Sequence, residues 1–202
     1  MTPAGALDRG LEQLALELPP GARDNLLRYV ELLAKWNRTY NLTAIRDPLD
    51  MVRHHLLDSL VVIPHLPVAD GLLADVGSGA GLPGIPLAIA RPQWRITLND
   101  ASQKRAAFLR QAAIELGLAN VAVHEGRVEK WRPAERFAVV ISRAFAQLAR
   151  FIACCRHLVR PGGVLAAMTG AAPGDASGAE IIELHVPLLD AVRHLALWRL
   201  EA

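Results

Sequence analysis

The amino-acid sequence predicts an α/β protein with a mostly parallel sheet of seven strands, helices on both faces and a helical extension at the N-terminus. Three observations support this fold class. Residues 1–70 show helical spacing of apolar side chains, and from residue 71 short apolar runs alternate with helical stretches. A cluster of glycines follows the first of these runs. Alternating strands and helices are typical of a parallel sheet that binds ligands at the carboxyl ends of its strands.

The helical extension carries two clear signals. Residues 26–34 place apolar side chains at helical spacing after a Pro-Pro-Gly entry. Asp47 and Pro48 are expected to be the N-cap and the first residue of a further helix, which stops at Pro64.

Four side chains of this region are expected to be structural. Trp36 is expected to pack the N-terminal helices onto the sheet, with stacking on a base as the alternative. His54 and His55 lack a third ligand at metal spacing, so we assign them no zinc. His55 and Asp58 have the spacing of a contact within one helix.

The remaining elements follow in order. Strands are expected at residues 72–76, 95–99, 121–124, 137–141, 164–168, 181–186 and 194–200. Helices are expected from about residue 83, from Ser102 to Leu116, and from about residue 147 to 159, ahead of a Pro-Gly-Gly sequence. Residues 170–180 are expected to form a loop. The last two strands are joined too briefly for a crossover, so we expect them to be antiparallel.

The composition is that of an ordinary folded domain. The chain has 202 residues, of which 52% are hydrophobic and 21% charged. A chain of this length buries roughly 70% of its unfolded surface without disulfides or metals. The net charge of +2 does not by itself indicate a nucleic-acid partner. All but three of the 22 basic side chains are arginine, which suits forked contacts with phosphate and carboxylate and fits GC-rich coding equally well.

The cysteines and the N-terminus indicate a cytoplasmic protein. Cys154 and Cys155 are adjacent, so they cannot form an ordinary disulfide with each other, and they lack the spacing of metal ligands. The N-terminal segment carries Asp8 and Glu12 where a signal peptide has basic residues and then an apolar stretch. No apolar run approaches the roughly 20 residues that span a bilayer. We therefore expect one core, no membrane partner and no metal.

Residues 75–84 read Asp-Val-Gly-Ser-Gly-Ala-Gly-Leu-Pro-Gly and are the most informative segment. Glycines between a strand and a helix let backbone N–H groups approach a ligand without obstruction by Cβ atoms. Gly79, Gly81 and Gly84 match the G-x-G-x-x-G fingerprint of dinucleotide-binding proteins, and Asp100 follows Gly79 by 21 residues. One interpretation is therefore an NAD-dependent oxidoreductase.

The start of the glycine run favours a different cofactor. The carboxylate of Asp75, two residues before Gly77, would repel a pyrophosphate but suits a cationic α-amino group. The pattern acid-x-Gly-x-Gly-x-Gly resembles the cofactor loop of class I S-adenosylmethionine-dependent methyltransferases, whose fold is Rossmann-like. This resemblance implies that a second acid, here Asp100, holds the ribose hydroxyls. Because both interpretations use Asp100, only Asp75 discriminates between them.

The residues after the fourth expected strand bear on the methyl acceptor. Ser142-Arg143-Ala144-Phe145 stands where exocyclic-amine methylation uses an Asn/Asp-Pro-Pro-aromatic motif. Methylation at carbon 5 of a pyrimidine needs a cysteine nucleophile, and both cysteines lie in an apolar stretch well past this loop. Ring nitrogens and oxygens remain, and guanine N7 has an in-plane lone pair that needs no general base.

Seven short strings occur in order along nearly the whole chain: residues 35–37, 40–44, 55–59, 75–86, 104–105, 127–129 and 141–145. Together they resemble the ribosomal RNA small subunit methyltransferase G family, also called glucose-inhibited division protein B. The resemblance implies transfer of a methyl group from S-adenosylmethionine to N7 of guanine 527 in 16S ribosomal RNA. The implied partner is that RNA or the assembling small subunit, bound by a monomer.

The resemblance and the patterns above together define a set of expected site residues. Cofactor contacts are expected at Asp75, Gly77, Gly79, Leu82, Asp100, Val128, Glu129 and Arg143. Lys104, Arg105 and Arg127 are candidates for RNA contact, although a solvated face explains these charges equally well. Arg143 is the catalytic candidate, as a positioning residue that grips a phosphate, bonds guanine O6 or holds the cofactor's carboxylate.

Two positions depart from the family pattern. Thr169 ends the fifth expected strand where the family often has lysine, and Gly126 replaces a frequent serine. One possible RNA-contacting charge is therefore missing.

We expect residues 1–70 to be a helical extension packed on a methyltransferase domain of residues 71–202, as one structural unit.

Overall fold

The computed structural model describes residues 1–67, 71–143, 147–174 and 176–201. Its strands are β1 (Leu72–Val76), β2 (Arg95–Asp100), β3 (Val121–Glu125), β4 (Phe137–Arg143), β5 (Val159–Thr169), β6 (Glu180–His185) and β7 (Val192–Arg199). They form one seven-stranded sheet in the order β3-β2-β1-β4-β5-β7-β6. The first five strands pair in parallel, whereas β7 is antiparallel to both β5 and β6. The expected fold class and the antiparallel end of the sheet are confirmed.

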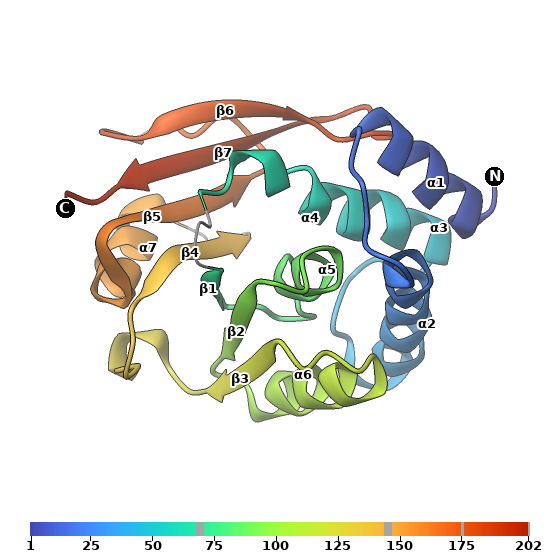
Figure 1. Ribbon diagram of the computed structural model, residues 1–202, viewed down its shortest axis with the longest axis horizontal. Coiled ribbons are helices and arrows are strands. Elements are labelled where there is room, and N and C mark those ends of the chain that lie inside the picture. Colours follow the sequence, from blue (N-terminus) through green and yellow to red (C-terminus); the bar gives the residue numbers. More distant parts are fainter. Residues whose placement is uncertain (68–70, 144–146, 175, 202) are drawn as a thin grey trace.

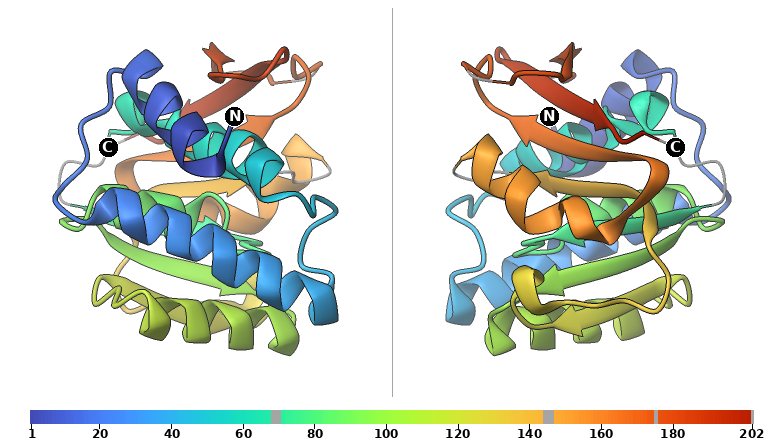
Figure 2. Two further views of the ribbon diagram at one scale, coloured as in Figure 1. Left: turned by 90° about the vertical axis from the view of Figure 1, so that its right-hand side faces the viewer. Right: turned by 90° about the vertical axis from the view of Figure 1, so that its left-hand side faces the viewer.

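Helices cover both faces of this sheet (Figures 1 and 2). They are α1 (Pro3–Gln13), α2 (Ala22–Tyr40), α3 (Pro48–Met51), α4 (Asp58–Leu60), α5 (Gly84–Ala90), α6 (Gln103–Glu115) and α7 (Leu148–Cys155), with the π-helix η1 (Val52–Leu57) and the 3₁₀-helices η2 (Ile63–His65), η3 (Val128–Lys130) and η4 (Arg156–Leu158). The helices α1 to α6 lie on one face, and α7 lies on the other. In the part of the chain that the structure describes, no helix is long and apolar enough to cross a membrane.

Successive side chains of a β-strand point to opposite faces of the sheet, so the side chains of β1 alternate between the two faces. Leu73 belongs to the larger apolar cluster, which also holds the buried side chains of α1, α2, α5 and α6. Leu72 and Ala74 belong to the smaller cluster, together with Phe151 and Cys155 of α7. A strand buried on both faces is apolar throughout, as Leu72–Val76 nearly is.

The N-terminal helices share the larger core with the sheet. Leu7, Leu26 and Leu57 are fully buried in the same cluster as Leu73. The buried hydroxyl of Tyr29 in α2 also donates a hydrogen bond to the carbonyl oxygen of Ala80, at 2.7 Å. The helical extension therefore packs directly against the loop that follows β1.

The helix expected after Asp47 begins as predicted but is not a regular α-helix. The Asp47 carboxylate accepts hydrogen bonds from the N–H groups of Leu49 and Asp50, at 2.9 and 3.1 Å. After one turn of α3 the chain widens into the π-helix η1 and returns to α-helix in α4. The wide turn carries His54, whose carbonyl oxygen accepts a hydrogen bond from Arg143. This contact joins the segment to a distant strand, and local spacing does not reveal it.

The expected boundary between residues 159 and 164 is wrong. The helix α7 ends at Cys155 and η4 continues to Leu158, so β5 starts at Val159. The Pro-Gly-Gly sequence lies inside β5, at a register shift between the pairs Phe137–Val159 and Val139–Val164. Such an irregularity accommodates a proline and glycines that a regular central strand excludes. Ala144 and Phe145, in the motif after the fourth expected strand, lie outside the described residues.

Candidate active site

The loop after β1 brings its backbone to the carboxyl edge of the sheet. Gly77 and Gly81 have positive φ, at 69° and 89°, a conformation that other residues rarely adopt. A Cβ atom at Gly77 would meet no heavy atom within 4 Å, whereas one at Gly81 would overlap the side chain of Ile85. The first glycine therefore leaves open space beside the loop, and the second permits a tight contact with α5.

Asp100, at the end of β2, holds this loop in place. One carboxylate oxygen accepts a hydrogen bond from the Gly79 N–H at 3.0 Å, and the other accepts one from the Ser102 N–H at 2.8 Å. Arg105 lies 3.6 Å from the first of these oxygens. An ionised carboxylate has about four lone-pair sites, so Asp100 keeps the capacity to accept further hydrogen bonds from a ligand.

A cavity of about 320 Å³ opens at the ends of β1, β2 and β3. It is lined by Val76, Gly77, Asn99, Asp100, Ala101, Arg105, Gly126, Arg127, Val128, Glu129 and Arg150. The structure thus brings together six of the expected site residues: Gly77, Asp100, Arg105, Arg127, Val128 and Glu129. We refer to this cavity as the loop cavity.

Two polar side chains in the lining of the loop cavity, Asn99 and Arg150, were not predicted from the sequence. Asn99 donates hydrogen bonds to the carbonyl oxygens of His124 and Gly126, at 3.2 and 2.9 Å, and so holds the end of β3 against β2. Its place beside Asp100 at a strand end is the signal that could have identified it. Arg150 comes from α7, on the opposite face of the sheet, and no local pattern marks it.

The donor and acceptor groups of the loop cavity fit the adenosyl part of S-adenosylmethionine. Asp100 offers carboxylate oxygens to vicinal hydroxyls, and the apolar Val76 and Val128 offer surface to a flat ring. Val128 and Glu129 also line the cavity. Gly77 leaves room for the ligand.

Asp75 and Leu82 lie beneath the loop, outside the lining of the loop cavity. Asp75 is fully buried, and one of its oxygens accepts a hydrogen bond from the Gly84 N–H at 2.9 Å. Its other oxygen has no partner among the described residues. Burial raises the pKa of this carboxyl to about 7. Leu82 is buried in the larger core. The role of Asp75 towards a cationic amino group stays a prediction.

Arg143, at the end of β4, lines a second cavity of about 450 Å³. The lining consists of Thr43, Ala44, Ile45, His54, His55, Asp58, Arg143, Met168, Thr169, Gly170 and Arg193. Its residues come from the helical extension, from β4, from the end of β5 and from β7. We refer to this cavity as the arginine cavity. It shares no lining residue with the loop cavity among the residues that the structure describes.

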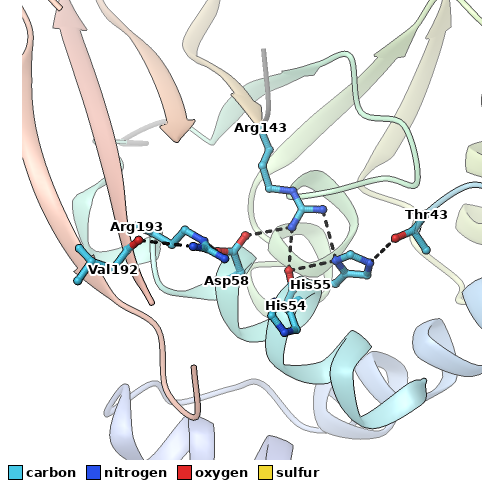
Figure 3. A network of polar contacts seen from close by, with 7 residues as sticks. All are labelled: Thr43, His54, His55, Asp58, Arg143, Val192 and Arg193. Atoms are coloured by element: carbon cyan, nitrogen blue, oxygen red, sulfur yellow. Dashed lines mark hydrogen bonds and ion pairs between the residues drawn. The ribbon is translucent and has the colours of Figure 1, made fainter. Parts of the chain in front are cut away.

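A buried carboxylate joins the two arginines of this cavity (Figure 3). The two oxygens of Asp58 accept from Arg143 Nη1 at 3.0 Å and from Arg193 Nε at 3.2 Å. The Asp58 side chain is only 7% exposed. Arg143 Nη1 also donates to the carbonyl oxygen of His54 at 3.0 Å. The expected contact between His55 and Asp58 is replaced by these longer-range pairs, because Asp58 is held by the sheet.

His55 completes the network as a neutral side chain. Its Nε2 atom lies 2.8 Å from the Thr43 hydroxyl, and its Nδ1 atom lies 3.0 Å from the carbonyl oxygen of His54. Burial, reinforced by the charge of Arg143, lowers the pKa of this imidazole to about 4. Within the described residues, no cluster of three or more metal-binding side chains occurs.

The two cavities flank the boundary between β1 and β4. These strands are neighbours in the sheet although the chain visits β2 and β3 between them. The Ser142 hydroxyl in β4 donates a hydrogen bond to the carbonyl oxygen of Val76 in β1, at 2.8 Å. Ligands of open α/β sheets bind at such a reversal of strand order, outside the carboxyl ends of the strands.

Tyr40, at the C-terminal end of α2, lies next to both Trp36 and Lys104. The Trp36 ring is 5.0 Å from the Tyr40 ring and 5.5 Å from the buried Phe108 ring, so Trp36 packs α2 onto α6. The Nζ atom of Lys104 lies 5.7 Å from the centre of the exposed Tyr40 ring. Contact of Lys104 with RNA stays a prediction.

The sheet order, the glycine loop and the acid at the end of β2 define a class I methyltransferase. Solved structures support this class at the level of the fold. A SAM-dependent methyltransferase from Aquifex aeolicus superimposes with a TM-score of 0.57 and 15% identity, covering 83% of this chain and 97% of that one. A precorrin-6y C5,15-methyltransferase from Geobacter metallireducens superimposes with a TM-score of 0.53 and 15% identity, covering 69% and 87%.

Sequence comparison identifies the family within this class. The model of the GidB family, rRNA small subunit methyltransferase G, matches residues 22–186. The protein of that name from Methylobacillus flagellatus is 52% identical over 94% of both chains. The one from Burkholderia thailandensis is 51% identical over 94% of this chain and 88% of its own. The chain therefore belongs to the rRNA small subunit methyltransferase G family, as its sequence motifs predicted.

Proposed function

We infer that the protein transfers a methyl group from S-adenosylmethionine to N7 of guanine 527 in 16S ribosomal RNA. Family membership over residues 22–186 carries this conclusion. The alternative of an NAD-dependent oxidoreductase has no support from the comparisons. A ribosomal substrate also places the protein in the cytoplasm, and we propose that it acts as a monomer on RNA or on the assembling small subunit.

The loop cavity holds the cofactor in this proposal. S-adenosylmethionine supplies an electrophilic methyl group on a sulfonium centre. Asp100 accepts hydrogen bonds from the ribose hydroxyls, and the backbone at Val128 and Glu129 meets the adenine edge. Gly77 and Gly79 keep the loop close to the ligand, while Leu82 and Asp75 support the loop from beneath. Arg105 and Arg127 line this cavity, and we propose that they contact RNA.

The arginine cavity receives the acceptor nucleotide. It lies on the other side of the boundary between β1 and β4, so a methyl group that leaves the loop cavity at this boundary faces it. Guanine N7 would attack the methyl carbon with its in-plane lone pair while the bond from that carbon to the sulfonium sulfur breaks, which would release S-adenosylhomocysteine. The protein's task is to orient the base and the methyl group. N7 methylation makes the base cationic, so Arg143 acts on a phosphate, on guanine O6 or on the cofactor's carboxylate rather than on N7.

The helical extension is part of this active unit. Thr43, His54, His55 and Asp58 line the arginine cavity, and all four precede residue 70. We therefore propose that residues 1–70 and residues 71–202 function together and that the methyltransferase domain alone lacks one wall of its acceptor site.

Mapping N7-methylguanine in 16S ribosomal RNA tests the function. RNA from cells that lack this gene should carry no modification at guanine 527, and the wild-type gene should restore it. Purified protein with S-adenosylmethionine, offered either protein-free RNA or small-subunit particles from those cells, identifies the substrate. Persistence of the modification without the gene, or its appearance at another guanine, would contradict the proposal.

A further inference from the structure

Two arginines from different strands converge on one carboxylate of the arginine cavity (Figure 3). Arg143 reaches Asp58 from β4, and Arg193 reaches it from β7. Arg143 was predicted as a site residue from the sequence and Arg193 was not, and Arg193 lies beyond the range matched by the family model. Asp58 lies on α4, so three elements that are distant in sequence meet at this point.

The charges of this cluster do not balance. Two guanidinium groups face one carboxylate, and Asp58 is the only acidic residue among those that the structure places around the cavity. His55 adds no charge at neutral pH because its pKa is lowered to about 4. The cluster therefore has one positive charge in excess, on side chains that are only 21% and 26% exposed. Partly buried charge is costly to leave uncompensated, and a singly charged anion removes this cost.

Arg193 retains donors for such an anion. A guanidinium has five N–H donors. Among the described residues, Arg193 uses Nε on Asp58 and Nη1 on the carbonyl oxygen of Val192, the latter at 3.5 Å. The Asp58 carboxylate fixes one edge of the group, so the remaining donors are oriented before a ligand arrives. A planar fork of this kind suits an oxyanion with two free oxygens.

We propose that Arg193 and Arg143, both held by Asp58, form a binding site for one phosphodiester of the substrate RNA. The inference rests on the proposed function, and it adds Arg193 as an RNA contact and Asp58 as a positioning residue. The neutral lining beside the arginines, including Ile45, Met168 and Thr169, leaves room for the attached nucleoside.

The cofactor's carboxylate is the other singly charged oxyanion within reach of this region. The arrangement of the cavities favours the phosphodiester, because the arginine cavity shares no described lining residue with the loop cavity. Arg193 also lies two strands away from β4 in the sheet, on the side opposite to β1. A phosphodiester ligand predicts a loss of RNA affinity in an Arg193 variant, whereas the cofactor's carboxylate predicts a loss of cofactor affinity. One variant therefore separates the two ligands.

The test compares the Arg193→Gln variant with the wild-type chain in two binding experiments. Affinity for a 16S ribosomal RNA transcript is measured over a series of salt concentrations, and affinity for S-adenosylhomocysteine is measured by calorimetry. We expect RNA affinity at least tenfold lower, a slope of log affinity against log salt smaller by about one, and cofactor affinity within threefold. Arg193→Lys should keep the slope but not the full affinity, because it keeps the charge and loses the fork.

A matched control lies on the same strand. Arg199 in β7 is 62% exposed, pairs only weakly with the exposed Glu180 and lines neither cavity. Arg199→Gln removes the same charge from the protein, and we expect its RNA affinity to stay within twofold. Melting temperatures of all variants check that they are folded.

Other outcomes overturn the proposal in identifiable ways. Reduced affinity for S-adenosylhomocysteine with unchanged RNA affinity would assign the arginines to the cofactor's carboxylate. Unchanged affinity for both ligands would leave only a structural ion pair. Neither measurement requires methyl transfer, so a wild-type protein that binds RNA but does not form N7-methylguanine would contradict the proposed function and leave the phosphodiester site standing.

Asp58→Asn tests the positioning role separately. This variant leaves one acceptor oxygen for two arginines and raises the net charge by one, so RNA affinity and its salt slope should not fall. We expect the turnover number kcat to drop at least tenfold, because the phosphodiester is bound without a fixed geometry. A parallel loss of RNA affinity, or full turnover, would remove Asp58 from this role.

Discussion

The loop cavity and the arginine cavity are assembled in different ways. The loop cavity is lined mainly by residues 76–129, where three consecutive strands end side by side. The arginine cavity takes its lining from residues 43–45, 54–55, 58, 143, 168–170 and 193. The loop cavity is therefore formed mostly by one continuous stretch of sequence. The arginine cavity forms only when the helical extension and the β7 end of the sheet pack together. Substitutions in the two cavities should therefore separate cofactor affinity from events on the RNA.

The largest effect is expected in the loop cavity, from Asp100→Ala. This carboxylate holds the N–H groups of Gly79 and Ser102 as well as the proposed ribose contact. Loss of charge-assisted hydrogen bonds costs about 1.5–3 kcal/mol, so calorimetry should show S-adenosylhomocysteine affinity reduced roughly 10- to 150-fold.

Asp100→Asn is the conservative control, since it keeps one acceptor oxygen and should lose less affinity. RNA affinity without cofactor should be unchanged in both variants. A folded Asp100→Ala protein with unaltered affinity for S-adenosylhomocysteine would mean that the cofactor does not bind in the loop cavity.

The converse effect is expected in the arginine cavity, from Arg143→Ala. If Arg143 acts on the RNA, methylation should fall at least tenfold, about 1.4 kcal/mol, with cofactor affinity within threefold. Arg143→Lys should also be impaired, because lysine lacks the planar guanidinium whose Nη1 atom bonds Asp58 and the carbonyl oxygen of His54 while its Nη2 atom faces His55 Nδ1 at 3.5 Å.

Steady-state methylation and calorimetry on the same preparations distinguish the alternatives. Equal losses of activity and cofactor affinity would indicate that Arg143 binds the cofactor's carboxylate. The two cavities would then not separate cofactor binding from RNA binding. Full activity in Arg143→Ala would remove the residue from the mechanism.

The same difference explains how far the sequence could predict the site. Asp100, Val128 and Glu129 follow strands whose apolar runs are visible in the sequence, so their meeting at one edge of a parallel sheet could be expected. Arg143 was accessible for the same reason, because it ends β4. The expected sheet and its antiparallel end were correct because strand alternation and connection length are local properties.

Features that depend on tertiary contacts were not predictable. Predicting them requires knowledge of which elements pack together. They include the π-helix η1, the pairing of Asp58 with Arg143, and the pairing of Asp58 with Arg193. The bulge in β5 belongs to the same group, since Pro161 looks like a stop signal until its register against β4 is known. The expected partner of His55 was an intrahelical carboxylate, and the folded chain gives it Thr43 instead.

The smallest effect is expected from Asp75, which belongs to neither cavity and supports the glycine loop from the core. Its pKa is raised to about 7 by burial, whereas in the unfolded chain a carboxyl of this type has a pKa near 4. Between these values the folded state binds more protons than the unfolded state, so stability falls as pH rises from about 4 to about 7 and levels off above that. In the interval from pH 6 to pH 7 this loss amounts to about 1 kcal/mol.

Asp75→Asn should remove this loss, because a neutral amide replaces a carboxyl that must ionise while buried. The amide oxygen can still accept the hydrogen bond from the Gly84 N–H. The melting temperature of the variant relative to wild type should therefore rise between pH 6 and pH 7, by roughly 2–4 °C for a chain of this size. Asp8→Asn is the control. Arg23 lowers the pKa of the exposed Asp8 carboxyl, so this group is ionised in the folded and unfolded states from pH 6 to pH 7. The difference in melting temperature between Asp8→Asn and wild type should therefore not change over this range. A flat difference for Asp75→Asn as well would show that the Asp75 carboxyl is already ionised beneath the loop, which requires a partner for its second oxygen.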